Sequence, residues 1–127
     1  MEIILNSPLD MHLHMRQDEM LKNVARYSSK DFSGAIVMPN LQPPVTNKEL
    51  VLAYREKILE AIGDDKFEPL MTVFYAKDFD VKALEDIKEH ITAVKYYPMG
   101  ITTNSEDWRN LKSMGYHFFF MVRPMVL

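Results

Sequence analysis

The chain has 127 residues, of which 47% are hydrophobic and 26% are charged, and its formal net charge is −3. This composition predicts one small globular domain with a core of its own and is not typical of disorder. No basic patch stands out, so a nucleic-acid partner is not expected. The sequence has no cysteine, which excludes a disulfide scaffold and a thiolate zinc site. Any metal must therefore be held by His, Asp, Glu or a modified side chain.

The N-terminal stretch MEIILNSPLD has an acid at position 2 and no long apolar core, so we expect no signal peptide. No apolar run approaches the ~20 residues that a membrane span needs. These two features lead us to expect a cytoplasmic protein without a membrane partner.

Short apolar runs alternate with helix-like segments as far as Tyr97. The pattern predicts strands over residues 9–15, 35–38, 69–75 and 92–97, and helices over residues 18–28, 48–62 and 80–90. The order β-α-β-α-β-α-β favours an α/β fold in which parallel strands are joined by helical crossovers.

Two of the helices carry more detailed predictions. In the first, the spacing places Met20, Leu21, Val24 and Tyr27 on one face. In the second, Asn47 is the expected N-cap and Gly63 ends the helix.

The pattern weakens beyond Tyr97. Residues 101–107 (ITTNSED) are expected to form a polar loop, and residues 108–115 a short helix. The final stretch FFFMVRPMVL is apolar, but its Arg123-Pro124 interruption suits neither a buried strand nor a helix.

His12 and His14 are two residues apart in the first predicted strand. Alternation in a strand places both side chains on the same face, so both imidazoles could reach one metal ion. The end of a strand is also where parallel barrels gather their catalytic groups. The simpler alternative is two histidines packed or exposed by chance, because an HxH pair alone is a weak motif.

Arg16 has the same strand parity, and a guanidinium next to a metal ion needs an anion between the two charges. A substrate carboxylate would satisfy both. Asn40 follows the second predicted strand, and its amide could donate to the same carboxylate. The alternatives are a surface arginine and an ordinary turn residue after proline.

Lys95 lies within the apolar segment AVKYYP. Burial of its ammonium is costly and lowers the pKa, and a neutral lysine can react with carbon dioxide to give a carbamate that bridges two metals. The alternative is a lysine that extends from the strand end to solvent. His90 is expected to face solvent near a helix end, and His117 has no supporting context.

Five strings in this order resemble the single-domain bacterial type of dihydroorotase: DMHLHMR (10–16), AIVMPNLQPPVTN (35–47), YREKIL (54–59), PLMTVFY (69–75), and VKYYP followed by ITTNS (94–105). The resemblance covers roughly residues 5–105, and MPNLQPPV is its most specific part. It implies a partial (β/α)8 TIM barrel with about the first four βα units. Residues 1–105 would be the N-terminal part of a metal-dependent amidohydrolase barrel, and residues 106–127 an atypical tail.

The resemblance also implies roles for particular residues. His12 and His14 match metal ligands, Lys95 matches the carbamylated lysine that bridges two Zn²⁺ ions, and Arg16 and Asn40 match the residues that hold the substrate carboxylate. The implied reaction interconverts N-carbamoyl-L-aspartate and dihydroorotate in pyrimidine synthesis, in an enzyme that is a cytoplasmic homodimer. No catalytic residue is assigned in this chain, since the acid–base aspartate and two further histidine ligands are expected beyond residue 127.

Two alternatives remain open. Another cyclic amidase, such as a hydantoinase or an allantoinase, would share the HxH pair, although Arg16 and the MPN loop speak against it. The other alternative is a truncated, catalytically inactive fragment or a non-catalytic relic of the enzyme.

The tail suggests a shifted reading frame. In the family this region leads into His-Gly-Glu-Thr-Asn, whose histidine is a metal ligand, whereas here Met-Val-Arg-Pro-Met-Val follows Phe120. Because methionine has one codon, reading one nucleotide earlier forces glycine at two junctions and permits His, Glu, Thr and Asn at the others. We therefore expect that loss of one base has put the tail out of frame, with coincidence as the alternative.

Overall fold

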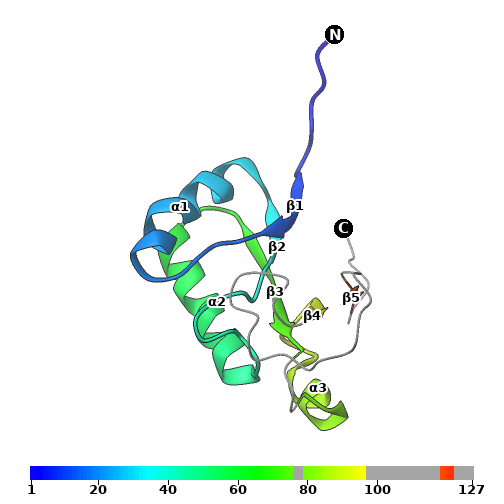
Figure 1. Ribbon diagram of the computed structural model, residues 1–127. Coiled ribbons are helices and arrows are strands. Elements are labelled where there is room, and N and C mark those ends of the chain that lie inside the picture. Colours follow the sequence, from blue (N-terminus) through cyan, green and yellow to red (C-terminus); the bar gives the residue numbers. More distant parts are fainter. Residues whose placement is uncertain (76–78, 97–117, 122–127) are drawn as a thin grey trace.

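The computed structural model describes residues 1–75, 79–96 and 118–121, and its strands form one sheet. Its elements are β1 (Leu9–Leu13), α1 (Asp18–Asp31), β2 (Gly34–Val37), α2 (Lys48–Ile62), β3 (Glu68–Phe74), α3 (Val81–Ile87), β4 (Ala93–Tyr96) and β5 (Phe118–Met121) (Figure 1). The strands lie in the order β1-β2-β3-β4-β5, and β1 to β4 are parallel. This confirms the predicted α/β fold of a partial TIM barrel.

The predicted ends of α2 are confirmed. The Asn47 side-chain oxygen accepts a hydrogen bond from the Leu50 amide at 2.9 Å, which satisfies an amide of the first helical turn. Gly63 ends the helix at a φ of 64°, a left-handed conformation that glycine adopts without steric cost. The third helix is shorter than expected at both ends: Asp80 is its N-cap and accepts from the Ala83 amide at 2.8 Å, and Lys88 is its C-cap.

The buried face of α1 differs from the predicted one. Leu21 is buried as expected, but Met20 and Tyr27 are 57% and 77% exposed. The inward face instead carries Leu21, Ala25 and Ser29. Small residues at two of these positions let α1 pack closely beside α2, a requirement that the spacing of large apolar residues does not reveal.

The core lies between the sheet and helices α1 and α2, which cover one side of it (Figure 1). The close approach of β2 and β3 depends on Gly34, because a Cβ there would lie 2.7 Å from the carbonyl oxygen of Glu68. The buried core residues include Met15, Leu21, Ala25, Ala35, Val37, Val45, Val51, Tyr54, Ile58, Ile62, Phe67, Met71, Val73, Ile87, Ile91 and Val94.

The tail contributes one strand, β5, which pairs antiparallel with β4. The expectation that the final apolar stretch forms neither strand nor helix is therefore wrong for Phe118–Met121, which precede the Arg123-Pro124 interruption. The reason is that β4 offers an open edge whose backbone groups β5 can pair with. The predicted loop 101–107, the predicted helix 108–115, His117 and Arg123-Pro124 lie outside the described residues.

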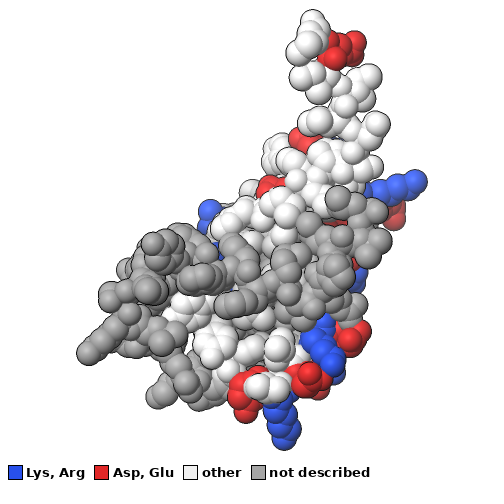
Figure 2. Space-filling model, turned by 90° about the vertical axis from the view of Figure 1, so that its right-hand side faces the viewer, with Lys and Arg blue, Asp and Glu red and all other residues white. Residues whose placement is uncertain are grey.

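The surface is mixed in charge. On the face shown in Figure 2, Lys and Arg side chains lie next to Asp and Glu. The extended N-terminal segment before β1 projects from the fold (Figure 1), and its Ile3, Ile4 and Leu5 are each more than 70% exposed. Within the part of the chain that the structure describes, no helix is long and apolar enough to cross a membrane.

Candidate metal and substrate site

The candidate residues come from three parallel strands. His14 follows β1, Asn40 follows β2 and Lys95 is the third residue of β4. Because the strands are parallel, their carboxyl ends meet at one edge of the sheet, which is where barrel enzymes place their chemistry. Residues that are far apart in the sequence, from β1, β2 and β4, therefore lie at the same edge of the sheet.

His12 and His14 lie beside each other, with ring centroids 5.3 Å apart. Two imidazoles bound to one tetrahedral zinc ion have ring centres about 5 Å apart, given Zn–N bonds of about 2.0–2.1 Å. Burial, followed by the charges of Lys95, His12 and Arg16, lowers the pKa of His14 to about 4. A neutral imidazole is the form that ligates metal, so this pair fits a metal ion.

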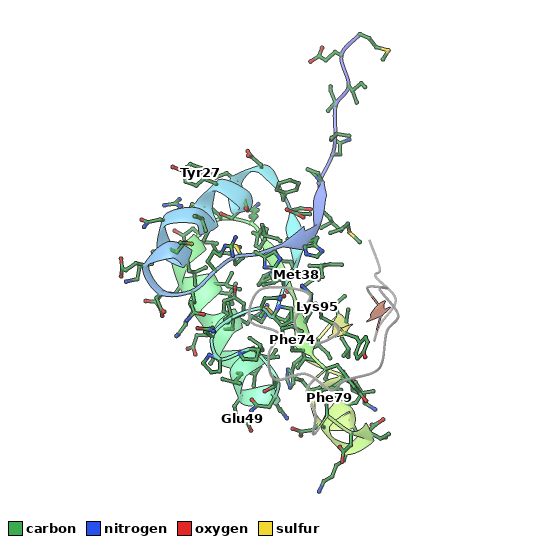
Figure 3. All side chains as sticks on the ribbon, in the orientation of Figure 1. Tyr27, Met38, Glu49, Phe74, Phe79 and Lys95 are labelled. Carbon is green, nitrogen blue, oxygen red and sulfur yellow. The ribbon has the colours of Figure 1, made fainter. Side chains whose placement is uncertain are left out.

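Lys95 is almost completely buried, at 1% exposure. Its Nζ donates to the Asn40 side-chain oxygen at 2.6 Å. The same Nζ lies 3.5 Å from the sulfur of Met38, and Figure 3 labels Lys95 and Met38. Burial lowers the pKa of Lys95 to about 8, so a sizeable fraction of the amine is neutral near physiological pH. The alternative of a lysine extending to solvent is wrong, because the side chain is buried and its Nζ reaches Asn40 and Met38 in the segment after β2.

Arg16 is near the cluster, but the alternation of side chains along β1 does not place it there. β1 ends at Leu13, and Arg16 has a φ of 63°, so the predicted parity with His12 and His14 does not reach it. The left-handed turn leaves the Arg16 side chain exposed while its charge still acts on His14. Arg16 is therefore placed by the turn that precedes α1.

Asn40 is half-buried and connects the loop after β2 to Lys95. Since its side-chain oxygen accepts a hydrogen bond from Lys95 Nζ, its side-chain amide nitrogen is left to donate to another group. The structure thus brings His12, His14, Asn40 and Lys95 together, with Arg16 within electrostatic range. Their roles as ligands and as substrate-binding groups stay predictions.

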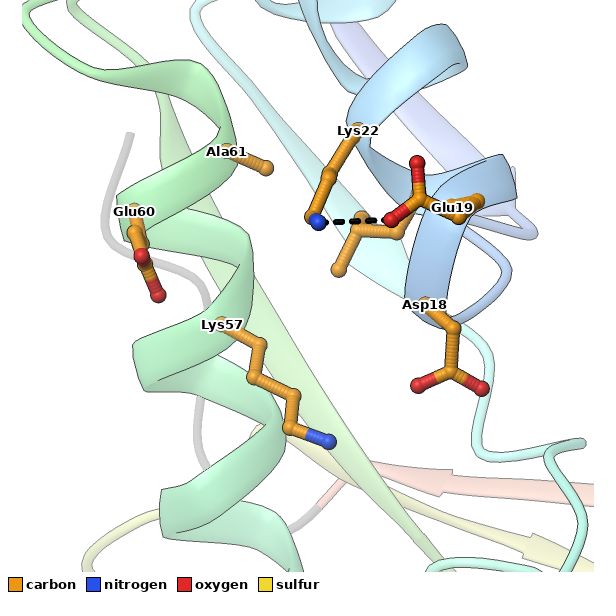
Figure 4. A pocket seen from close by; sticks show the side chains of 7 residues that line it. Asp18, Glu19, Lys22, Lys57, Glu60 and Ala61 are labelled. Atoms are coloured by element: carbon orange, nitrogen blue, oxygen red, sulfur yellow. Dashed lines mark hydrogen bonds and ion pairs between the residues drawn. The ribbon is translucent and has the colours of Figure 1, made fainter.

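Other candidates lie outside this cluster. His90 follows α3 and is half-buried, rather than facing solvent as expected. A separate pocket lies between α1 and α2, where charged side chains such as Lys22 and Glu19, which form a 2.7 Å ion pair, line it (Figure 4). Within the described residues, no three His, Cys, Asp or Glu side chains gather as a metal site.

Comparison with known proteins favours a single family. A dihydroorotase from Helicobacter pylori is 43% identical over 108 residues, and one from Agrobacterium fabrum is 48% identical over 106 residues. The crystal structure of the Campylobacter jejuni dihydroorotase superimposes with a TM-score of 0.75 at 50% identity, over 79% of this chain. This chain resembles part of a dihydroorotase. No family model matches the sequence.

The match covers most of this chain but a small share of its relatives. It includes 84% of this chain and 31% of the H. pylori dihydroorotase, and 29% of the C. jejuni structure. The chain thus spans about three tenths of the length of the dihydroorotases that it matches. A hydantoinase from Arthrobacter aurescens superimposes with a TM-score of 0.53 at 13% identity, which shows a shared fold alone.

Three residues near the cluster were not singled out from the sequence. Tyr54, Gln17 and Gln42 make hydrogen bonds to the two loops that carry Arg16 and Asn40. Tyr54 begins the string YREKIL, which was noted for its resemblance without a role. Its contact joins residues 38 positions apart, so no local pattern could have revealed it.

Proposed function

We propose that this chain is part of a dihydroorotase, the enzyme that interconverts N-carbamoyl-L-aspartate and dihydroorotate in pyrimidine synthesis. The observation that carries the proposal is the convergence of the His12–His14 pair, Asn40 and Lys95 at the strand ends of a fold that matches dihydroorotases. Residues 1–105 would then be the N-terminal part of the barrel, and residues 106–127 an atypical tail.

His12, His14 and Lys95 would hold the metal centre. Two zinc ions would supply hydroxide at neutral pH and polarise the carbonyl of the ring. For Lys95, the neutral amine would form an N–C bond to carbon dioxide and release one proton, giving a carbamate. Compared with the protonated amine, the carbamate places an anion where a buried cation would be, which suits a side chain that lies beside a metal site.

Arg16 and Asn40 would bind the substrate carboxylate. The guanidinium of Arg16 can form two parallel charge-assisted hydrogen bonds, and the Asn40 amide can add a third donor. In a complete enzyme, Arg16→Ala should weaken transition-state binding by about 2–5 kcal/mol, with metal content unchanged. Unaltered kcat and KM after that substitution would remove Arg16 from the site.

The proposed whole enzyme is a cytoplasmic homodimer that acts on a small molecule. For the 127-residue chain by itself we expect no turnover, because the acid–base aspartate that the family implies matches no motif in it. Weak metal binding is expected, since an incomplete ligand set leaves coordination positions to water.

Metal binding by the purified chain tests the proposal. Calorimetric titration with zinc should give weak binding that His12→Ala and His14→Ala each abolish, while His90→Ala leaves it unchanged. Mass spectrometry of the native chain in bicarbonate should show the added mass of one carbon dioxide, which Lys95→Gln removes and Lys82→Gln does not. Zinc binding that is indifferent to His12 and His14 would refute the metal assignment.

A non-catalytic relic of the enzyme is the second candidate. Cyclisation of carbamoyl aspartate by the purified chain would exclude it. A substrate panel that includes hydantoins would separate dihydroorotase from hydantoinase activity.

A further inference from the structure

Two loops carry the proposed carboxylate-binding side chains, and an amide pair fastens these loops together. Gln17 follows Arg16, and Gln42 lies two residues after Asn40. The Gln42 main-chain amide donates to the Gln17 side-chain oxygen at 2.9 Å, and the Gln17 side-chain nitrogen donates to the Gln42 carbonyl at 3.2 Å. Two reciprocal hydrogen bonds fix both the distance and the relative orientation of the loops.

Gln17 uses its side chain for this link and not for helix capping. It occupies the N-cap position of α1 but makes no side-chain cap hydrogen bond. An N-cap usually supplies an oxygen to the amides of the first turn, and Ser, Thr, Asp or Asn does so better than Gln. The choice of a longer amide at this position is explained by the loop contact across 25 residues.

Tyr54 holds the other side of the Arg16 turn. Its hydroxyl, on the core-facing side of α2, donates to the main-chain oxygen of Arg16 at 2.8 Å. Tyr54 is 4% exposed, and burial raises the pKa of its phenol, so the group remains a hydrogen-bond donor. Arg16 has a φ of 63°, a conformation that costs a non-glycine residue roughly 1–2 kcal/mol, so the turn needs such a contact to persist.

We propose that Tyr54 and Gln17 are positioning residues that set the spacing between Arg16 and Asn40, and thereby select a substrate with a carboxylate between them. The inference rests on the proposed function, since it takes Arg16 and Asn40 as the carboxylate-binding pair. Neither Tyr54 nor Gln17 needs to touch the substrate, because each acts through the backbone of a loop.

The experiment uses the full 127-residue chain with ¹⁵N-labelled arginine side chains, in the presence of zinc. The Arg16 resonance, assigned by Arg16→Lys, is followed by NMR while N-carbamoyl-L-aspartate is added, and the uncharged diamide of the same compound serves as the control ligand. The variants are Tyr54→Phe, Gln17→Leu and Gln17→Glu, which keeps the acceptor and loses the donor. Tyr27→Phe is the matched control, because Tyr27 is 77% exposed.

We expect Tyr54→Phe to weaken carboxylate binding about fivefold and Gln17→Leu about 25-fold, as for the loss of one and two hydrogen bonds. Gln17→Glu should fall between Gln17→Leu and the unsubstituted chain. In Tyr54→Phe and Gln17→Leu the ¹⁵N relaxation of Arg16 should report a less ordered side chain, whereas Tyr27→Phe should change neither property.

Unchanged binding and unchanged order of Arg16 in both Tyr54→Phe and Gln17→Leu would overturn the inference. A fall in thermal stability alone, without either NMR change, would also overturn it and assign the contacts to folding only. If the unsubstituted chain shows no carboxylate-dependent shift, the proposed function loses its substrate site. In that case the ¹⁵N relaxation of the Arg16 side chain in the variants still decides whether Tyr54 and Gln17 hold the turn.

Discussion

At the scale of single residues, the enclosed charges near the strand ends set the properties of the cluster. Lys95 is buried beside the Asn40 side-chain oxygen and the Met38 sulfur, and its charge acts on His14. Burial disfavours the charged form of each group, and the nearby positive charges disfavour protonated His14 further. The cluster therefore carries less positive charge than fully protonated His14 and Lys95 would give it. A lower positive charge favours the binding of a metal cation.

His14 gives a pH prediction. Its folded pKa of about 4 is below the ordinary value of 6.5, so the unfolded chain takes up this proton first as the pH falls. The stability that neutral His14 provides is complete above pH 6.5 and is lost between pH 6.5 and about 4. An NMR titration of His14 should show a midpoint near pH 4, and His14→Gln should flatten the loss of stability in that window. A midpoint near 6.5 would contradict the burial of His14.

At the scale of elements, side-chain hydrogen bonds fix where helices begin and how they join the sheet. Asn47 caps α2, Asp80 caps α3, and Ser29 together with Arg26 connects α1 to the loop after α2 through Asp65. Each of these contacts occurs at an end of an element, where backbone groups or loops lack the partners that a regular ladder supplies.

Asn47→Ala should destabilise the chain by about 1 kcal/mol, because the amide of Leu50 loses its acceptor at the start of α2. Denaturant unfolding measures the change. Asn23→Ala is the matched control, since Asn23 is exposed within α1 and alanine favours a helix interior. Equal stability of Asn47→Ala and the unsubstituted chain would show that the cap contributes nothing.

The Ser29–Asp65 contact gives a second pH prediction. The Ser29 hydroxyl donates to Asp65 at 2.6 Å, and this hydrogen bond, with Arg26, lowers the pKa of the Asp65 carboxyl. Because the folded pKa is depressed, the contribution is present above the unfolded pKa and is lost as the pH falls through the folded one. Asp65→Asn should therefore lower the melting temperature at pH 7 and make little difference at pH 2. Asp64→Asn, at an exposed position, is the control, and a pH-independent effect of Asp65→Asn would refute this account.

At the scale of the whole molecule, the described strands form an open sheet with β1 as one edge strand. At the opposite end of the described sheet β5 pairs with β4, so β5 and not β4 is the second edge strand. The segment before β1 adds exposed Ile3, Ile4 and Leu5 near the β1 edge. An apolar segment next to an unpaired edge favours pairing with another chain.

We expect the purified chain to self-associate or to be poorly soluble. Sedimentation velocity over a range of concentrations should show a rising average mass, and Ile4→Lys should shift the distribution toward monomer. Lys82→Glu, at an exposed position of α3, is the control for a change of charge far from β1. A concentration-independent monomer with a sharp, reversible melt would contradict the expectation.

The tail gives a prediction at the level of the gene. If a base was lost near the codon of Phe120, the nucleotides from Met121 to Val126 should spell His-Gly-Glu-Thr-Asn-Gly in the shifted frame. Sequencing of these nucleotides tests the hypothesis, because methionine has a single codon and few alternative readings of the shifted frame are possible. Codons that cannot give that reading would end the hypothesis.

The sequence by itself determined the order of strands and helices, the ends of α2, and the identity of His12, His14, Asn40 and Lys95 as candidates. These features depend on local periodicity, capping and a specific loop motif, and each of these is determined by residues close together in the sequence. The buried face of α1, the left-handed turn at Arg16, the pairing of β5 with β4 and the contacts of Tyr54 and Gln17 were decided only by the tertiary structure. Each depends on partners distant in the chain, and packing against those partners overrides the local pattern.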